Sequence, residues 1–114
     1  MRKKNTSAWM LPGGKLDDHE TASEALVREL AEELQIEVDI AALRFMGTFN
    51  AKAANEANTA VNAQAFRVRL ADGQSPMHAA EIAEIKWISL TDPLPQDIAP
   101  LLKNSIIPAL QTVR

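Results

Sequence analysis

The stretch Gly14–Ile36, GKLDDHETASEALVRELAEELQI, places a glycine turn before a segment rich in Ala, Leu and Glu. Asp, Thr and Ser side chains just ahead of that segment are helix-capping types, so the pattern predicts a helix over about Thr21–Leu34. At about 100° per residue, leucines share one arc of this helix and glutamates share the neighbouring arc. These residues are Leu26, Leu30 and Leu34 on the first arc, and Glu29, Glu32 and Glu33 on the second. One side is therefore expected to pack and the adjacent side to form an acidic strip.

The acidic strip carries like charges at helical neighbours. Glu29, Glu32 and Glu33 stand at i, i+3 and i+4, where each like-charge pair costs a helix about 0.2–0.5 kcal/mol. A hard cation such as Mg²⁺ would compensate this repulsion, because it prefers oxygen ligands and is often completed by phosphate oxygens of a substrate. Gly13 and Gly14 let the backbone approach closely, and Gly14 can offer its carbonyl as a further ligand. The pattern predicts a divalent-metal site.

Two further charged residues stand at fixed offsets from the strip. Glu20 and Arg28 have opposite charges at the junction between loop and helix, and we expect an ion pair that fixes the loop. A glutamate-rich helix on its own is usually a solvated surface. The combination of glycine turn, isolated glutamate, arginine and glutamate triplet favours a functional site over that simpler interpretation.

This combination resembles the signature of the Nudix hydrolases, which runs Gly, five residues, Glu, seven residues, then Arg-Glu-apolar-any-Glu-Glu-any-Gly-apolar. The chain matches the signature at Gly14, Glu20, Arg28, Glu29, Leu30, Glu32, Glu33 and Ile36. The lead-in Leu11–Lys15 (LPGGK) is also similar to that of the family. The later stretch EIAEIKWISL is similar to a usual strand near the C-terminus of family members.

The resemblance implies an α+β fold of the Nudix type, an α/β/α sandwich with a mixed sheet. It also implies Mg²⁺- or Mn²⁺-dependent hydrolysis of a nucleoside diphosphate linked to another group. By the same resemblance, Glu29, Glu32 and Glu33 are metal ligands and catalytic residues, with Glu29 one candidate for the base. Glu81, six residues before Trp87, lies where family members often supply another carboxylate, although a solvated loop glutamate explains it equally well.

Two departures from the family pattern carry expectations of their own. Gln35 replaces the glycine at the helix exit, where a left-handed residue is usual, and this should cost roughly 1 kcal/mol or change the exit geometry. Only eleven residues precede Pro12, so the fold is expected to be shortened at its N-terminus. An uncovered sheet edge invites pairing with another copy, which predicts a homodimer.

The remaining sequence predicts short strands and a second helix. The strands are expected at Trp9–Leu11, Leu43–Lys52, Gln64–Leu70 and Glu84–Leu90, and the helix at Asp97–Leu110. Residues 54–63 (ANEANTAVNA) are interpreted as a loop. The alternation in Leu43–Lys52 places Phe45, Gly47 and Phe49 on one face, and Pro108 is expected to kink or end the second helix.

Composition limits the partners. The 114 residues are consistent with a single domain, 1–114. A net charge of -3 argues against polymeric nucleic acid as the main partner. The chain has no cysteine and no apolar run near the roughly 18 residues of a membrane span, so we expect a cytoplasmic protein without a membrane segment.

The substrate is less constrained than the chemistry. The sequence favours a (deoxy)nucleoside triphosphate, with Lys15, Phe49 and Asn50 as candidate substrate-binding residues, and Trp9 and Phe45 as further rings that could stack on a base. A nucleotide sugar or a capped RNA end is the alternative substrate. A nucleotide-binding domain without catalysis is the alternative of another class, and the intact glutamate triplet argues against it.

Overall fold

The computed structural model of the chain describes residues 1–52, 60–70, 73–77, 81–91 and 93–112. In chain order the elements are β1 (Arg2–Lys3), α1 (Ala22–Leu34), η1 (Ile40–Ala42), β2 (Leu43–Lys52), β3 (Ala60–Val68), β4 (Ile82–Glu84), the π-helical η2 (Leu102–Ile106) and α2 (Ile107–Thr112). The α+β class is confirmed. None of the described helices is long and apolar enough to cross a membrane.

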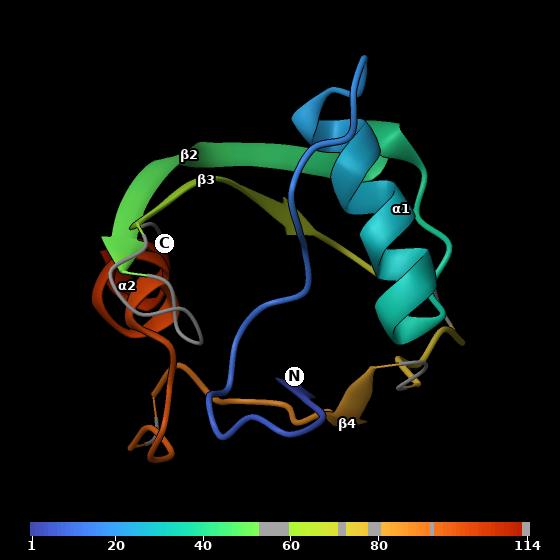
Figure 1. The fold of residues 1–114 in the computed structure, drawn as a ribbon. Coiled ribbons are helices and arrows are strands. Elements are labelled where there is room, and N and C mark those ends of the chain that lie inside the picture. Colours follow the sequence, from blue (N-terminus) through green and yellow to red (C-terminus); the bar gives the residue numbers. More distant parts are fainter. Residues whose placement is uncertain (53–59, 71–72, 78–80, 92, 113–114) are drawn as a thin grey trace.

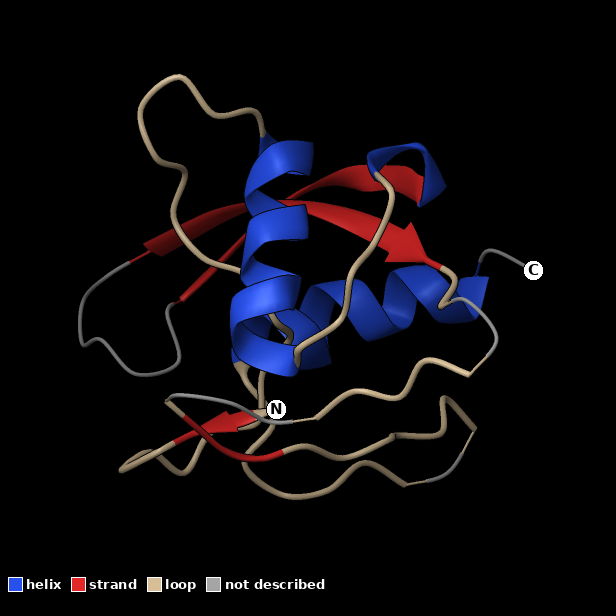
Figure 2. Ribbon diagram, turned by 90° about the vertical axis from the view of Figure 1, so that its right-hand side faces the viewer, coloured by secondary structure: helices blue, strands red, loops and turns tan. Residues whose placement is uncertain are grey.

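The strands pair in two small antiparallel sheets, with the helices between them. Figure 1 shows the β2–β3 sheet across the top, β1 and β4 at the bottom, α1 at the right and α2 at the left. Figure 2, turned by 90°, keeps the same three levels. The mixed sheet expected from the sequence is represented in the described residues by these two sheets and one parallel bridge, Trp9 to Ile98.

Helix α1 begins where the sequence predicts. The Thr21 side chain accepts a hydrogen bond from the Glu24 backbone N–H at 3.2 Å, and the Glu24 carboxylate accepts from the Thr21 N–H at 2.9 Å. This reciprocal capping box satisfies donors that a helix start leaves unpaired. The leucine arc is buried as expected, since Leu30 and Leu34 are 3% and 8% exposed.

Helix α1 ends at a left-handed residue that is not glycine. Gln35 has φ 55° and ψ 38°, and the backbone N–H groups of Gln35 and Ile36 both donate to the Leu30 carbonyl. The chain therefore keeps the left-handed exit of the family pattern, at a cost of roughly 1 kcal/mol for a residue with a Cβ atom. His19 in the preceding loop also has a positive φ of 65°.

Strand β2 has the predicted bounds, but one expected face is wrong. Phe45 pairs with Phe66 and Gly47 with Ala65, so Met46 is an extra residue on β2, a β-bulge. The bulge reverses the alternation between Phe45 and Phe49. Phe45 is 60% exposed and contacts Phe66 edge to face, whereas Phe49 packs against the cluster around η2.

Strand β3 begins earlier than predicted. Residues 60–63 were expected in a loop but pair with the end of β2, because backbone pairing needs no large side chains there. Residues 53–59, the rest of that expected loop together with Ala53, lie outside the described part of the chain. The strand ends at Val68, whose partner Leu43 is the first residue of β2. The predicted alternation is present, with Arg67 and Arg69 exposed between half-buried apolar residues.

The predicted strand Glu84–Leu90 is wrong in its position. The strand observed is β4, which ends at Glu84, and Trp87 is 80% exposed. Its partner β1 has only two residues, so the hydrogen-bond ladder ends early. Ile85 still packs against the core next to the ladder.

The C-terminal helix begins at Pro100 rather than Asp97, and Pro108 does not end it. A π-helical turn, η2, precedes the proline, and the Ile107 N–H donates to the Leu102 carbonyl. A widened turn of this kind accommodates a residue that lacks an N–H and whose ring crowds the preceding turn. The helix continues as α2 to Thr112.

Buried apolar side chains form two separate clusters. The first joins α1 to the β1–β4 ladder and contains Met1, Leu30, Leu34, Ile36 and Ile82. The second joins the β2–β3 sheet to the C-terminal helix and contains Leu102, Ile106 and Ile107. The first cluster anchors the leucine side of α1 and so fixes the direction in which the acidic strip points.

Candidate functional site

Arg28 is the centre of a network of carboxylates. Its Nε and Nη2 donate to the two oxygens of Glu20 at 2.9 and 3.0 Å, which is a bidentate pair, and the ion pair predicted from the sequence is present. Its Nη1 donates to Glu29 at 2.9 Å and to Glu32 at 3.3 Å. Its Nη2 also reaches the Lys15 carbonyl at 3.4 Å. Arg28 therefore ties the loop before α1 to the acidic strip.

Glu20 is held as a carboxylate by this network. The hydrogen bond from Arg28, followed by one from the Asp17 backbone N–H, lowers the pKa of Glu20 from its usual 4.5 to about 2. The same Glu20 hydrogen bond raises the pKa of Arg28. Both shifts favour the charged forms, so the pair persists across the neutral range.

The lowered pKa of Glu20 predicts that acid destabilises the fold over a defined pH range. A folded pKa of about 2 against an ordinary 4.5 means that the unfolded state binds the proton more readily, so the stabilisation is full above pH 4.5. It is lost as pH falls from 4.5 to about 2. We expect the denaturant midpoint of Glu20→Gln to depend less on pH over that window than the midpoint of wild type. The same pH dependence in both proteins would contradict the pairing of Glu20 with Arg28.

Glu29 lies against the glycine turn. Its Oε1 would be 2.7 Å from a Cβ atom added at Gly14, and its side chain is only 15% exposed. The same Oε1 accepts the hydrogen bond from Arg28. A residue with a side chain at position 14 would therefore meet the Glu29 carboxylate directly.

Glu33 lies next to Glu29 on the inner side of the strip. Its Oε1 accepts from the Gly13 backbone N–H at 2.9 Å. Burial raises the pKa of Glu33, and the neighbouring charge and hydrogen bond of Glu29 raise it further, while Gly13 and the charge of Lys3 oppose the rise. Two partly buried carboxylates thus share one glycine turn, an arrangement that a cation would relieve.

Glu32 stands apart from this pair. Its side chain is 58% exposed and lies against Arg28. Among the residues that the structure describes, no three His, Cys, Asp or Glu side chains form a group placed to hold a metal. The predicted strip of three is therefore observed as a close pair, Glu29 and Glu33, with Glu32 turned toward the arginine.

The contact at Gly14 predicts that alanine there will displace Glu29. The added Cβ would lie 2.7 Å from Glu29 Oε1, and the carboxylate is the mobile end of a side chain, so the carboxylate will move rather than the backbone. We expect Gly14→Ala to keep the melting temperature near wild type and to lower the hydrolysis that the family resemblance implies by about 10–100-fold, the range for loss of a residue that supports a metal ligand. Wild-type activity in this variant would contradict a role for the contact.

The candidate substrate residues are distributed over the molecule. Lys15 is exposed in the glycine loop, Asn50 is exposed on β2, and Phe49 packs in the cluster around η2. The end of β2 that lies over α2 is the end farther from α1 (Figure 1). The structure thus brings only Lys15 near the acidic strip, through its backbone contact with Arg28.

Glu81 lies beside β1. Its carbonyl accepts from the Lys4 backbone N–H at 2.7 Å, and it lines a hollow of about 400 Å³ with residues 3–6. Its side chain is exposed. In the described part of the chain it does not join the glutamates of α1 in a metal-binding group.

Two residues near the site were missed by sequence reasoning. Asp17 donates its backbone N–H to Glu20 at 2.9 Å and places its carboxylate 3.4 Å from Arg28 Nε. Lys3 is close enough to Glu33 to oppose the rise in its pKa. The three-residue spacing from Asp17 to Glu20 was a local signal for the first, whereas no sequence signal links Lys3 to α1.

Known proteins are similar to this chain over most of its length. Residues 1–110 match the NUDIX domain family. A Mycobacterium tuberculosis protein named "Putative 8-oxo-dGTP diphosphatase 2" is 35% identical over 107 residues, which cover 85% of this chain and 72% of that protein. A Bacillus subtilis protein named "Putative 8-oxo-dGTP diphosphatase" is 29% identical, over 93% of this chain and 66% of its own length. The 8-oxo-dGTP diphosphatase of Proteus vulgaris is 60% identical over 30 residues, covering 26% of this chain and 27% of that protein.

These matches, together with the glycine turn and the glutamate strip, define the class of protein. The chain belongs to the Nudix family. It is a Nudix hydrolase, an enzyme type that cleaves pyrophosphate bonds.

Proposed function

We propose that the chain hydrolyses a pyrophosphate bond of a (deoxy)nucleoside triphosphate with a divalent metal, Mg²⁺ or Mn²⁺. The observation that carries this proposal is the pair of partly buried carboxylates, Glu29 and Glu33, at the Gly13–Gly14 turn. Two acidic side chains at one backbone turn are a costly arrangement for a protein unless a cation or a reaction uses them.

The donor set fits a hard metal ion. Glu29 and Glu33 offer carboxylate oxygens, and the Gly14 carbonyl is the third candidate ligand, which agrees with the preference of Mg²⁺ and Mn²⁺ for oxygen. Glu32 would join them by leaving its 3.3 Å contact with Arg28. When bound, the ion would neutralise charge on the pyrophosphate and lower the pKa of a water.

The other residues hold these groups in place. Arg28 fixes Glu29 through the 2.9 Å hydrogen bond and fixes the loop through Glu20. The Gly13 N–H holds Glu33 Oε1. A glutamate of the strip then takes the proton of the attacking water, with Glu29 and Glu33 as the candidates for the base because both are partly withdrawn from solvent.

The relatives narrow the substrate that we propose. Three of them carry names that specify 8-oxo-dGTP diphosphatase. An oxidised purine triphosphate is therefore the first substrate to test, with Lys15 as a phosphate contact. Asn50, which is exposed, is the remaining candidate for a contact to the base, since Phe49 packs in the cluster around η2. Glu81 is a further candidate for a catalytic residue.

A panel of substrates tests the proposal. Purified protein is incubated with 8-oxo-dGTP, dGTP, ADP-ribose, a nucleotide sugar and capped RNA, each with Mg²⁺, with Mn²⁺ and with EDTA, and the products are separated by chromatography. We expect the monophosphate and pyrophosphate from a triphosphate, only with metal. Turnover of the nucleotide sugar or the capped RNA alone would show that this compound, and not the triphosphate, is the substrate. Binding without turnover of any compound would overturn the proposal of hydrolysis.

A further inference from the structure

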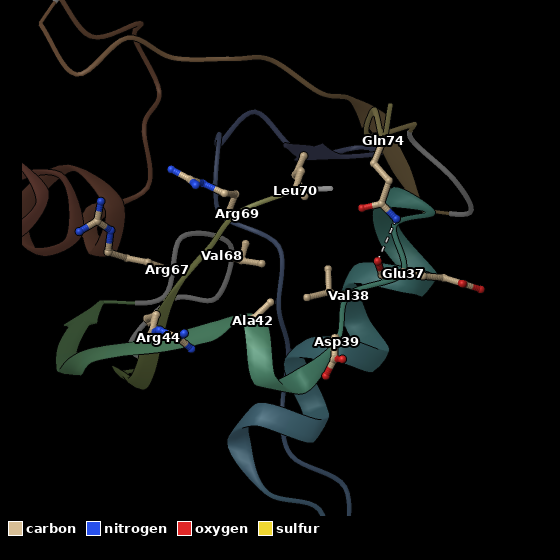
Figure 3. Close-up of a pocket in the computed structure, with 10 residues that line it drawn as sticks. All are labelled: Glu37, Val38, Asp39, Ala42, Arg44, Arg67, Val68, Arg69, Leu70 and Gln74. Carbon is tan, nitrogen blue, oxygen red and sulfur yellow. Dashed lines mark hydrogen bonds between the residues drawn. The ribbon is translucent and has the colours of Figure 1, made fainter. Parts of the chain in front are cut away.

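A large open hollow lies on the side of α1 that leads into β2. Its volume is about 1010 Å³, and it is lined by the segment after α1 and by the end of β3. None of the proposed metal ligands lines it. Figure 3 shows Val38 and Ala42 facing Val68 and Leu70 across its centre. The hollow is open to solvent, and none of the described elements covers its apolar centre.

The two walls of the hollow carry opposite charges. One wall presents Arg44, Arg67 and Arg69, and the other presents Glu37 and Asp39. Arg44 and Arg67 are direct partners across β2 and β3, where like charges destabilise a sheet. In Figure 3 the Arg67 and Arg69 side chains and the Glu37 carboxylate point away from the apolar centre on opposite sides.

These charges have few partners among the described residues. The described residues provide no ion pair for Arg67, Arg69 or Glu37, while Arg44 donates only to the Ala41 and Leu43 carbonyls. The Asp39 carboxylate accepts from the Ala41 N–H and caps η1. A basic wall and an acidic wall, both extended and both exposed, are thus complementary to each other but separated by the hollow.

The strand edge beside the hollow is also free. The sheet of β2 and β3 has two strands, so one edge of β3 lacks a partner in the described residues. The hollow is lined by Arg67 and Val68 at the end of β3 and by Arg69 and Leu70 just beyond that end. A two-stranded sheet with an open edge favours the addition of another extended segment.

We propose that this hollow is a self-association surface, where the arginine wall of one copy pairs with the Glu37–Asp39 wall of a second copy and the reverse. A two-fold axis repeats each contact, so one pairing generates the other. The second copy covers the apolar centre and provides each cation with a carboxylate. The fold leaves both halves of this contact exposed within a single chain.

Charge reversal tests the pairing. Wild type is expected to sediment at about twice the mass of the 12.5 kDa chain. Arg67→Glu with Arg69→Glu makes both walls acidic, and Glu37→Lys with Asp39→Asn leaves no net acidic wall while keeping a capping side chain on η1. Each double variant alone is expected to dissociate at least about 10-fold more readily, and an equimolar mixture of the two is expected to form the dimer again.

The controls separate association from folding. Lys52→Glu with Lys103→Glu makes the same charge change outside the hollow and should leave the dimer intact. Circular dichroism verifies each fold, and Arg67→Gln with Arg69→Gln replaces the glutamate variant if that one unfolds. A monomeric wild type, a dimer that survives the arginine changes, or a mixture that stays monomeric would each overturn the proposal.

Discussion

We expect Glu29→Gln or Glu33→Gln to lower the proposed nucleoside triphosphate hydrolysis by about 10²–10⁴-fold, the range for removal of a catalytic carboxylate. Glutamine keeps the side-chain volume, and at position 33 it can keep the hydrogen bond from the Gly13 N–H, but it removes the negative charge that a metal and a base both need. Because burial raises the pKa of Glu33, its ionised form opposes folding near neutral pH. Glu33→Gln should therefore be at least as stable as wild type.

Steady-state kinetics and thermal melts, measured on the same preparations, check this result. Asp18→Asn is the matched control, since Asp18 is an exposed carboxylate in the loop before α1. Loss of turnover together with an unchanged or raised melting temperature separates chemistry from folding. Full activity in both glutamine variants would exclude Glu29 and Glu33 as the site.

Replacing Arg28 with alanine is expected to have the next largest effect, a fall in kcat/KM of about 10–100-fold, as for removal of a residue that orients metal ligands. Arg28 contacts three carboxylates at 3.3 Å or less, so its loss frees Glu20 and Glu29 and leaves their charges unbalanced. Stability should fall as well, because Glu20 and Glu29 side chains are only 14% and 15% exposed.

Lysine at the same position distinguishes geometry from charge. Arg28→Lys keeps the cation but loses the bidentate contact with Glu20, so it should recover stability more than activity. A positioning role for Arg28 also predicts that raising the Mg²⁺ or Mn²⁺ concentration partly rescues both variants. Equal rescue of activity and stability by lysine would reduce Arg28 to a structural ion pair.

The helix and the acidic strip followed from local sequence because capping, period and charge spacing act within a few residues. Thr21 and Glu24 cap each other, and the leucine arc of α1 is buried as the 3.6-residue period required. The Glu20–Arg28 pair was also predictable, since Glu20 ends the loop before α1 and Arg28 lies eight residues later in that helix. The alternation of exposed Arg67 with half-buried Phe66 and Val68 was predictable in the same way.

The features that sequence reasoning missed depend on long-range partners. The bulge at Met46 appears only once β3 is paired with β2, and it reversed the expected side of Phe45. The strand near Trp87 stopped early because its partner β1 is short. The π-helical turn before Pro108 replaced the expected kink.

The geometry of the candidate site was predictable only in part, for the same reason. Spacing placed Glu29, Glu32 and Glu33 on one strip, but it could not predict that Arg28 turns Glu32 away from the other two, since this depends on side-chain rotamers. The nearness of Lys3 to Glu33 depends on the pairing of β1 with β4, eighty residues apart in the chain. Local patterns thus predicted which residues form the candidate site, and tertiary contacts set its geometry.

The most direct test is a titration of Mn²⁺ into the protein, with free Mn²⁺ followed by electron paramagnetic resonance. Wild type is expected to bind Mn²⁺, and Glu29→Gln with Glu33→Gln in one chain is expected to weaken that binding by at least about 10-fold, as the charged ligands are lost. Equal binding by wild type and the double variant would contradict the assignment of the metal to the carboxylate pair at the glycine turn.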